Sequence, residues 1–134
     1  MCLVANGHEC ASVVNLTQLK RLWLFDTDPL PVLNSLCHRR DVLGELDIHP
    51  PKDKRDLTEE ECAAYTAALS KAKIRSVRIA LYLSTSGWIA LSTGLSLNKE
   101  VRKATLWGVP RELHEEMRKI IESNPGITSL DICI

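Results

Sequence analysis

Apolar residues recur along the chain in one short pattern: an apolar residue, two others, an apolar residue, one other and a final apolar residue. The pattern occurs five times, at Leu19, Leu22 and Leu24; Leu43, Leu46 and Ile48; Ile74, Val77 and Ile79; Val101, Ala104 and Leu106; and Ile127, Leu130 and Ile132. Within each match, the last three positions of the pattern are apolar, other and apolar, as in a β-strand that is buried on one face. The middle residues stand at 22, 46, 77, 104 and 130, at intervals of 24, 31, 27 and 26. Such regular spacing predicts a repeat protein.

The segments between these predicted strands carry helical patterns. In 57–72, Thr58 and Glu61 have the spacing of a capping box that begins a helix. Residues 86–97 carry Ile89, Leu91 and Leu95, and residues 29–38 also hold apolar residues at helical spacing. In the run that begins at Gly108, Pro110 favours a helix start and 124–126 (Asn-Pro-Gly) favours its end. Residues 47–56 are polar with two prolines and predict a surface loop.

These motifs resemble a leucine-rich repeat of the ribonuclease-inhibitor-like class, with LxxLxL on the strand and GxxxLxxxL on the helix. In that class an asparagine stands three residues before the next strand. The two clearest matches are Gly87, Leu91, Leu95 and Asn98 before Val101, and Leu113, Met117, Ile121 and Asn124 before Ile127, the second without the glycine. The asparagine or cysteine that the class places after each strand is replaced by Thr27, Pro51, Tyr82 and Val109.

The resemblance implies an α/β fold, a right-handed leucine-rich-repeat solenoid with a short parallel sheet on the concave side and helices on the convex side. Packed helices are spaced more widely than neighbouring strands, which would bend the stack into such an arc. Residues 16–134 would form a single domain of about five repeats, and 1–15 an irregular N-terminal segment or a partial repeat. The strand that ends at Ile132 would have a neighbour on one side only. We therefore expect self-association through this C-terminal edge, or a longer array of which this chain is part.

Composition narrows the functional classes. Seventeen Lys and Arg residues balance seventeen Asp and Glu residues, and nothing in this charge indicates nucleic acid or an anionic membrane as a partner. No apolar run is long enough for a transmembrane helix, and the N-terminus has no signal-peptide pattern. Five cysteines at unrelated spacings predict reduced thiols in a cytoplasmic protein, with a disulfide framework as the less favoured alternative.

The strand pattern also predicts which side chains leave the sheet on the side away from the helices. They form three rows: Arg21, Glu45, Ser76, Lys103 and Ser129; Trp23, Asp47, Arg78, Thr105 and Asp131; and Phe25, His49, Ala80, Trp107 and Cys133. None of these fifteen positions holds Leu, Ile or Val. Aromatic residues and arginine are the usual anchors of protein interfaces.

We therefore predict that Trp23, Phe25, Asp47, Arg78 and Trp107 are exposed on this face and bind a partner protein. The alternative is that the aromatic side chains pack on turns or terminal regions.

No constellation of residues indicates catalysis. His8-Glu9-Cys10 has metal-ligand types but no partner cluster at fixed spacing, and no phosphate-binding glycine motif is present. We expect no catalytic, cofactor-binding or metal-binding residues, and hence no enzyme. The expected function is a non-enzymatic protein–protein interaction module that binds its partner on the concave strand face. The resemblance also implies two alternatives, a GTPase-activating protein of the Ran type or the substrate-binding part of a ubiquitin ligase receptor.

Overall fold

The computed structural model describes residues 2–6, 19–25, 28–49 and 57–134. They contain one six-stranded sheet whose strands lie in chain order, and every pairing in it is parallel. The strands are β1 (Cys2–Asn6), β2 (Arg21–Phe25), β3 (Leu43–Ile48), β4 (Ile74–Ala80), β5 (Lys103–Trp107) and β6 (Ser129–Ile132). The predicted parallel sheet is therefore confirmed.

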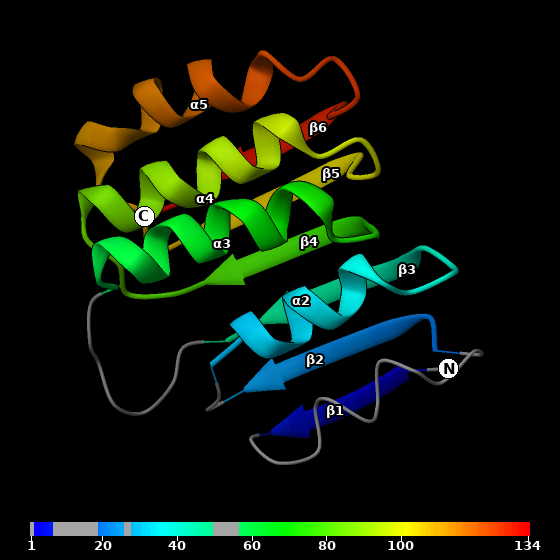
Figure 1. Ribbon diagram of the computed structural model, residues 1–134. Helices are drawn as coiled ribbons and strands as arrows, with labels where there is room; N and C mark the ends of the chain where they lie inside the picture. Colours follow the sequence, from blue (N-terminus) through cyan, green and yellow to red (C-terminus); the bar gives the residue numbers. More distant parts are fainter. Residues whose placement is uncertain (1, 7–18, 26–27, 50–56) are drawn as a thin grey trace.

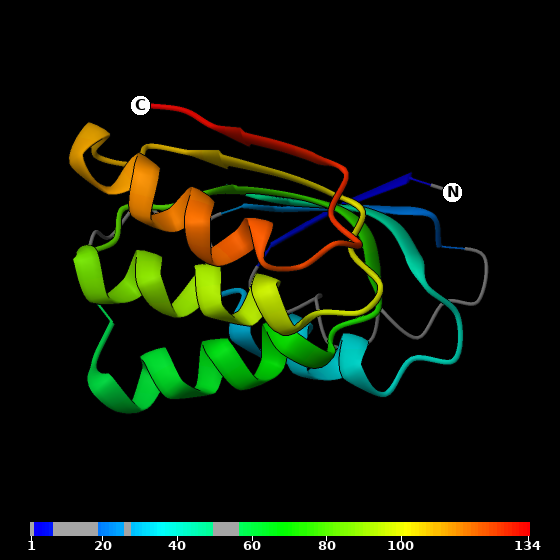
Figure 2. The same ribbon diagram turned by 90° about the horizontal axis from the view of Figure 1, so that it is seen from above.

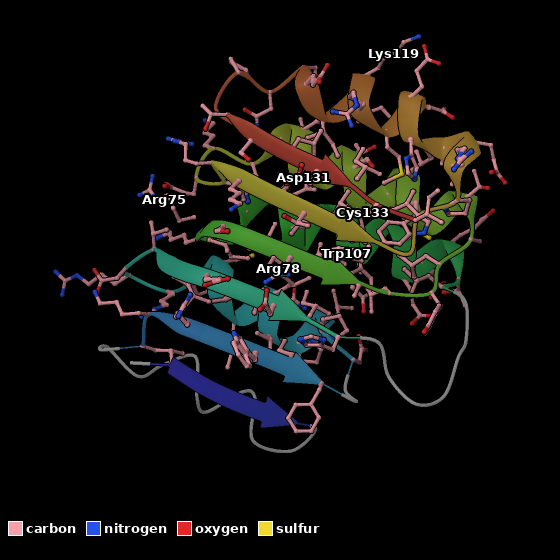
Figure 3. The ribbon with its side chains drawn as sticks, turned by 180° about the vertical axis from the view of Figure 1, so that it is seen from behind. Arg75, Arg78, Trp107, Lys119, Asp131 and Cys133 are labelled. Carbon is pink, nitrogen blue, oxygen red and sulfur yellow. The ribbon has the colours of Figure 1, made fainter. Side chains whose placement is uncertain are left out.

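Helices connect the successive strands from β2 onward. They are α2 (Leu30–Cys37), α3 (Glu59–Lys71), α4 (Thr85–Leu97) and α5 (His114–Glu122), the last preceded by the 3₁₀ turn η2 (Arg111–Leu113). Figures 1 and 2 show them side by side in one layer against a single face of the sheet. Among the described elements, the opposite face carries no helix (Figure 3).

Two helix starts follow from local hydrogen bonds. The Thr58 hydroxyl accepts from the amide of Glu61 at 3.2 Å, and the Glu61 carboxylate accepts from the amide of Thr58 at 3.2 Å. The predicted capping box is therefore confirmed. At α4, the Ser84 hydroxyl accepts from the amide of Gly87, which begins this helix at Thr85, one residue earlier than predicted.

The core lies between the sheet and the helices and is built on the predicted register. Leu46, Val77, Ala104 and Leu130 are successive partners across β3 to β6, as expected. The apolar positions of the first four pattern matches are at most 2% exposed, whereas those of the fifth are only half-buried. The fifth match lies at β6, which has a paired neighbour on one side within the described sheet.

Asn98 ties the segment before β5 to the end of α3, the helix of the preceding unit. Its side chain is 2% exposed. The amide nitrogen Nδ2 donates to the carbonyl oxygens of Leu69 and Ala72 at 2.6 and 2.9 Å. The oxygen Oδ1 accepts from the amides of Glu100 and Val101 at 2.7 and 2.9 Å. One side chain thus satisfies two carbonyls at the end of α3 and two amides before β5.

Asn124 takes the same place one unit later. Its Nδ2 donates to the carbonyl oxygens of Leu95 and Asn98 at 3.0 and 2.6 Å, and its Oδ1 accepts from the amide of Gly126 at 2.9 Å. Successive units are therefore tied together by equivalent side chains at a separation of 26 residues.

β1 lies within 1–15, for which the sequence left open an irregular segment or a partial repeat. Leu3 and Ala5 are aligned with Leu22 and Leu24 of β2. Residues 7–18 lie outside the described residues. Of the predicted surface loop 47–56, the first two residues instead belong to β3, because their pairing with β2 and β4 continues to Ile48. The part of that loop over 50–56 lies outside the described residues.

Candidate functional site

The three predicted aromatic residues are exposed on the sheet face opposite the helices. Trp23 is 39% exposed, Phe25 40% and Trp107 42%. Trp23 on β2 is aligned with Asp47 on β3, and Asp47 with Arg78 on β4, so an indole, a carboxylate and a guanidinium stand side by side. Figure 3 shows Arg78 and Trp107 on this face.

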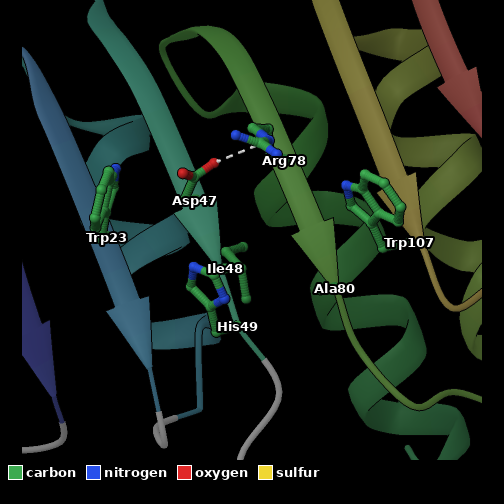
Figure 4. Close-up of a pocket in the computed structure, with 7 residues that line it drawn as sticks. All are labelled: Trp23, Asp47, Ile48, His49, Arg78, Ala80 and Trp107. Carbon is green, nitrogen blue, oxygen red and sulfur yellow. Dashed lines mark ion pairs between the residues drawn. The ribbon is translucent and has the colours of Figure 1, made fainter.

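A hollow of about 520 Å³ lies on this face (Figure 4). Its lining residues are Trp23, Asp47, Ile48, His49, Arg78, Ala80 and Trp107. The structure thus brings together four of the five residues predicted to bind a partner. Phe25 lies on the same face but is not among the lining residues.

The hollow exists because one position in its row is small. Ala80 on β4 is aligned with Trp107 on β5. On the other side, His49 follows Ile48, which is aligned with Ile79 directly before Ala80. The Ala80 methyl group therefore has a large indole on one neighbouring strand and an imidazole on the other, and the space above it stays open.

The prediction that Asp47 is exposed is wrong. Asp47 lies on the expected face but is only 6% exposed. The physical reason is its place: the short aspartate side chain stands between the larger Trp23 and Arg78 in the same row (Figure 4). Arg78 itself is exposed as predicted, with 49% of its side chain accessible.

The charge of Asp47 is incompletely compensated. Its oxygen Oδ1 lies 3.7 Å from Nε of Arg78, close enough for an ion pair but too far for a hydrogen bond. Oδ1 is buried and accepts no hydrogen bond from the described residues. Burial raises the pKa of the Asp47 carboxyl group above its ordinary value, and the Arg78 cation opposes this only in part. Within the described part of the chain, this buried acceptor therefore lacks a donor.

A second ion pair stands beside the hollow in the neighbouring row. Nε of Arg21 donates to the Glu45 carboxylate at 2.7 Å. This pair is shorter than the Asp47–Arg78 pair, although 56% of the Arg21 side chain is exposed. The long distance in the Asp47–Arg78 ion pair is therefore particular to that position and is not shared by all ion pairs on this face.

The sequence did not single out His49 and Ala80, although both were placed in the third row of face positions. Comparing the sizes of the side chains within that row would have found them. One alanine stands between a histidine and a tryptophan, which indicates a gap on the surface.

The described residues were also compared with the requirements of a metal site, a disulfide and a membrane-spanning helix. They contain no group of three or more His, Cys, Asp or Glu side chains arranged to hold a metal ion. Cys37, Cys62 and Cys133 form no disulfide among them. None of the helices in the described ranges is both long and apolar enough to span a bilayer.

Neither protein-family models nor curated protein sequences give a match to this chain.

Proposed function

We propose that this chain is a right-handed leucine-rich-repeat solenoid, with its helices on the convex side, that binds a partner protein on its helix-free sheet face. The main support for the proposal is the hollow, which is lined by four of the predicted binding residues: Trp23, Asp47, Arg78 and Trp107. The proposed role is binding without catalysis, in the cytoplasm.

The repeat architecture is supported by equivalence between units. Strands follow one another in chain order, and the middle apolar residues of successive patterns are aligned. Asn98 and Asn124 make corresponding hydrogen bonds at the ends of successive helices. A stack in which each unit contacts its neighbours is typical of solenoid proteins.

The two tryptophans of the hollow are suited to be interface anchors. Trp23 and Trp107 are each about two-fifths exposed. A tryptophan side chain buries up to about 250 Å², so covering the exposed part removes roughly 100 Å² from water. At about 25 cal/mol per Å², each tryptophan would contribute about 2–3 kcal/mol to binding. About three-fifths of each tryptophan is already inaccessible to water, which limits the side-chain entropy lost on association.

The test compares a Trp23→Ala/Trp107→Ala double variant with the wild type and with Leu97→Ala. Leu97 is 60% exposed at the end of α4, in the helix layer, and serves as the matched control for loss of an exposed apolar side chain. Partners captured from extracts of the source cells by the wild type are purified, and their affinity is measured by calorimetry. We expect the double variant to keep its circular dichroism spectrum and lose at least tenfold in affinity, about 1.4 kcal/mol or more.

Leu97→Ala should bind as the wild type does. Equal affinity of the double variant and the wild type would contradict the proposal. The identity of the captured protein, a GTPase, a ubiquitin ligase adaptor or another protein, separates the main function from the two alternatives that the resemblance implies.

A further inference from the structure

We propose that the residue the partner inserts into this hollow is a tyrosine, with its ring on Ala80 and its hydroxyl donating a hydrogen bond to the Asp47 carboxylate. This inference rests on the proposed function, since it names the chemistry that the partner must present.

The first observation is the missing donor. Asp47 is 6% exposed, and its Oδ1 accepts no hydrogen bond from the described residues. A buried acceptor without a donor costs free energy that a bound donor would recover. Because Asp47 lines the hollow, an occupant of the hollow is well placed to supply that donor.

The second observation concerns charge. Nε of Arg78 is already 3.7 Å from Oδ1, so a lysine or arginine from the partner would be brought beside a like charge. A neutral O–H donor meets no such repulsion and still forms a charge-assisted hydrogen bond with the carboxylate. The Arg78 side chain is 49% exposed, so it can rotate toward solvent and open Oδ1 to a donor.

The third observation is the shape and lining of the hollow. Its floor is the small Ala80, and the indole of Trp107 stands beside it in the register. A flat aromatic ring fits between such walls and stacks against an indole or a guanidinium. An aliphatic side chain would lack both interactions.

The fourth observation is reach. Ala80 is one strand away from Asp47 and two residues further along, since Asp47 is aligned with Arg78. Strands lie about 4.8 Å apart and two residues span roughly 6.6 Å, so the two positions are roughly 8 Å apart. Measured from its Cβ, a tyrosine side chain covers a comparable distance once the O–H···O hydrogen bond of about 2.7 Å is added. A tyrosine can therefore cover Ala80 and reach Asp47 at the same time.

The experiment uses small probes, so it requires no identified partner. The 134-residue chain is titrated with p-cresol, toluene and n-butylammonium, the side chains of tyrosine, phenylalanine and lysine in simplified form. Binding is followed by NMR at the indole N–H of Trp107 and the methyl group of Ala80. We expect p-cresol to bind roughly tenfold more tightly than toluene, in keeping with a hydrogen bond to a charged acceptor, and n-butylammonium to bind more weakly than p-cresol.

The variant Asp47→Leu should make p-cresol and toluene bind equally. The control Asp131→Ala removes another aspartate from the same row but not from the hollow, and should keep the tenfold preference. If Asp47→Leu fails to fold, Asp47→Asn preserves the shape, and its weaker acceptor should reduce the preference.

Three results would overturn the inference: equal binding of p-cresol and toluene to the wild type, tighter binding of n-butylammonium, or no response of Trp107 and Ala80 to any probe. None of these affects the proposed function, which stands or fails on the loss of partner binding in the Trp23→Ala/Trp107→Ala variant. The double variant could lose partner binding while the wild type shows no preference for p-cresol over toluene. That combination would support the binding face and reject tyrosine as the inserted residue.

Discussion

Replacing Asn98 by alanine should cost more stability than any other single polar substitution in the described residues. The side chain is 2% exposed and makes four hydrogen bonds, all to main-chain groups. Alanine satisfies none of them. Two of the partners are the carbonyl oxygens of Leu69 and Ala72, which lie where α3 ends and the helix supplies no further amide. The Ala72 oxygen also accepts from the amide of Ile74 at 3.1 Å, so the Leu69 oxygen depends more on Asn98.

The magnitude follows from those four bonds. A typical intramolecular hydrogen bond contributes about 1 kcal/mol net, and a buried group left without a partner costs about 1–3 kcal/mol. Glu100 is partly exposed, so water can replace one bond at little cost, whereas the amide of Val101 is buried. We therefore expect Asn98→Ala to lower the free energy of unfolding by about 3–5 kcal/mol. A domain of this size typically has about 5–15 kcal/mol in total, so a cooperative transition should remain measurable.

The assay is urea unfolding followed by tryptophan fluorescence and circular dichroism. The matched control is Asn124→Ala, because Asn124 occupies the same place one unit later but is only half-buried and makes three bonds. We expect a loss of about 1–2 kcal/mol there. Asn98→Asp should be nearly as harmful as alanine, since a carboxylate oxygen would face the two carbonyl oxygens. A loss below about 1 kcal/mol for Asn98→Ala, or one no larger than for Asn124→Ala, would refute the reasoning.

Four further predictions concern other parts of the structure. Trp88 is fully buried and its indole N–H has no hydrogen-bond partner among the described residues, so Trp88→Phe should cost at most about 2 kcal/mol in urea unfolding, against about 3–5 for Trp88→Ala. Thr58→Ala removes the capping box of α3 and should cost about 1 kcal/mol in the same assay. Because the folded pKa of Asp47 is raised, its ionisation destabilises the fold at neutral pH; Asp47→Asn should raise stability at pH 7, and the difference should vanish as pH falls through the folded pKa toward the unfolded one. Ile132→Lys should weaken any self-association through the open edge of β6 in analytical ultracentrifugation, and an unchanged sedimentation constant would reject that edge as the contact.

The strands and their register were predictable because one periodic signal governs both. An apolar triplet with fixed internal spacing determines which residues face the helices, and its recurrence aligns Leu46, Val77 and Ala104 across the sheet. The same alternation placed Trp23 and Trp107 on the opposite face. These inferences depend on where a side chain points, which the backbone alone determines.

Other features depend on the size of neighbouring side chains, and the periodic signal carries no information about size. Asp47 was expected to be exposed because of its place in the row, yet it is buried between larger residues. The hollow over Ala80 has the same origin. Trp88 was missed because the helical pattern of 86–97 was assigned from Ile89, Leu91 and Leu95. In the structure Trp88 is buried completely and Ile89 only partly.

The chain order of the strands has a consequence for how such a protein can change in length. In the described sheet, every strand pairs only with the strands before and after it, and paired residues are at most 31 positions apart, as for Leu46 and Val77. Loss of one 27-residue unit, from Ser76 to Arg102, would set β5 beside β3 and replace one parallel pairing by another. His49 would then meet Trp107 directly, and the hollow would be gone. Gain or loss of a whole unit can therefore create or erase a binding surface in one step, while the pairings of the remaining strands are kept.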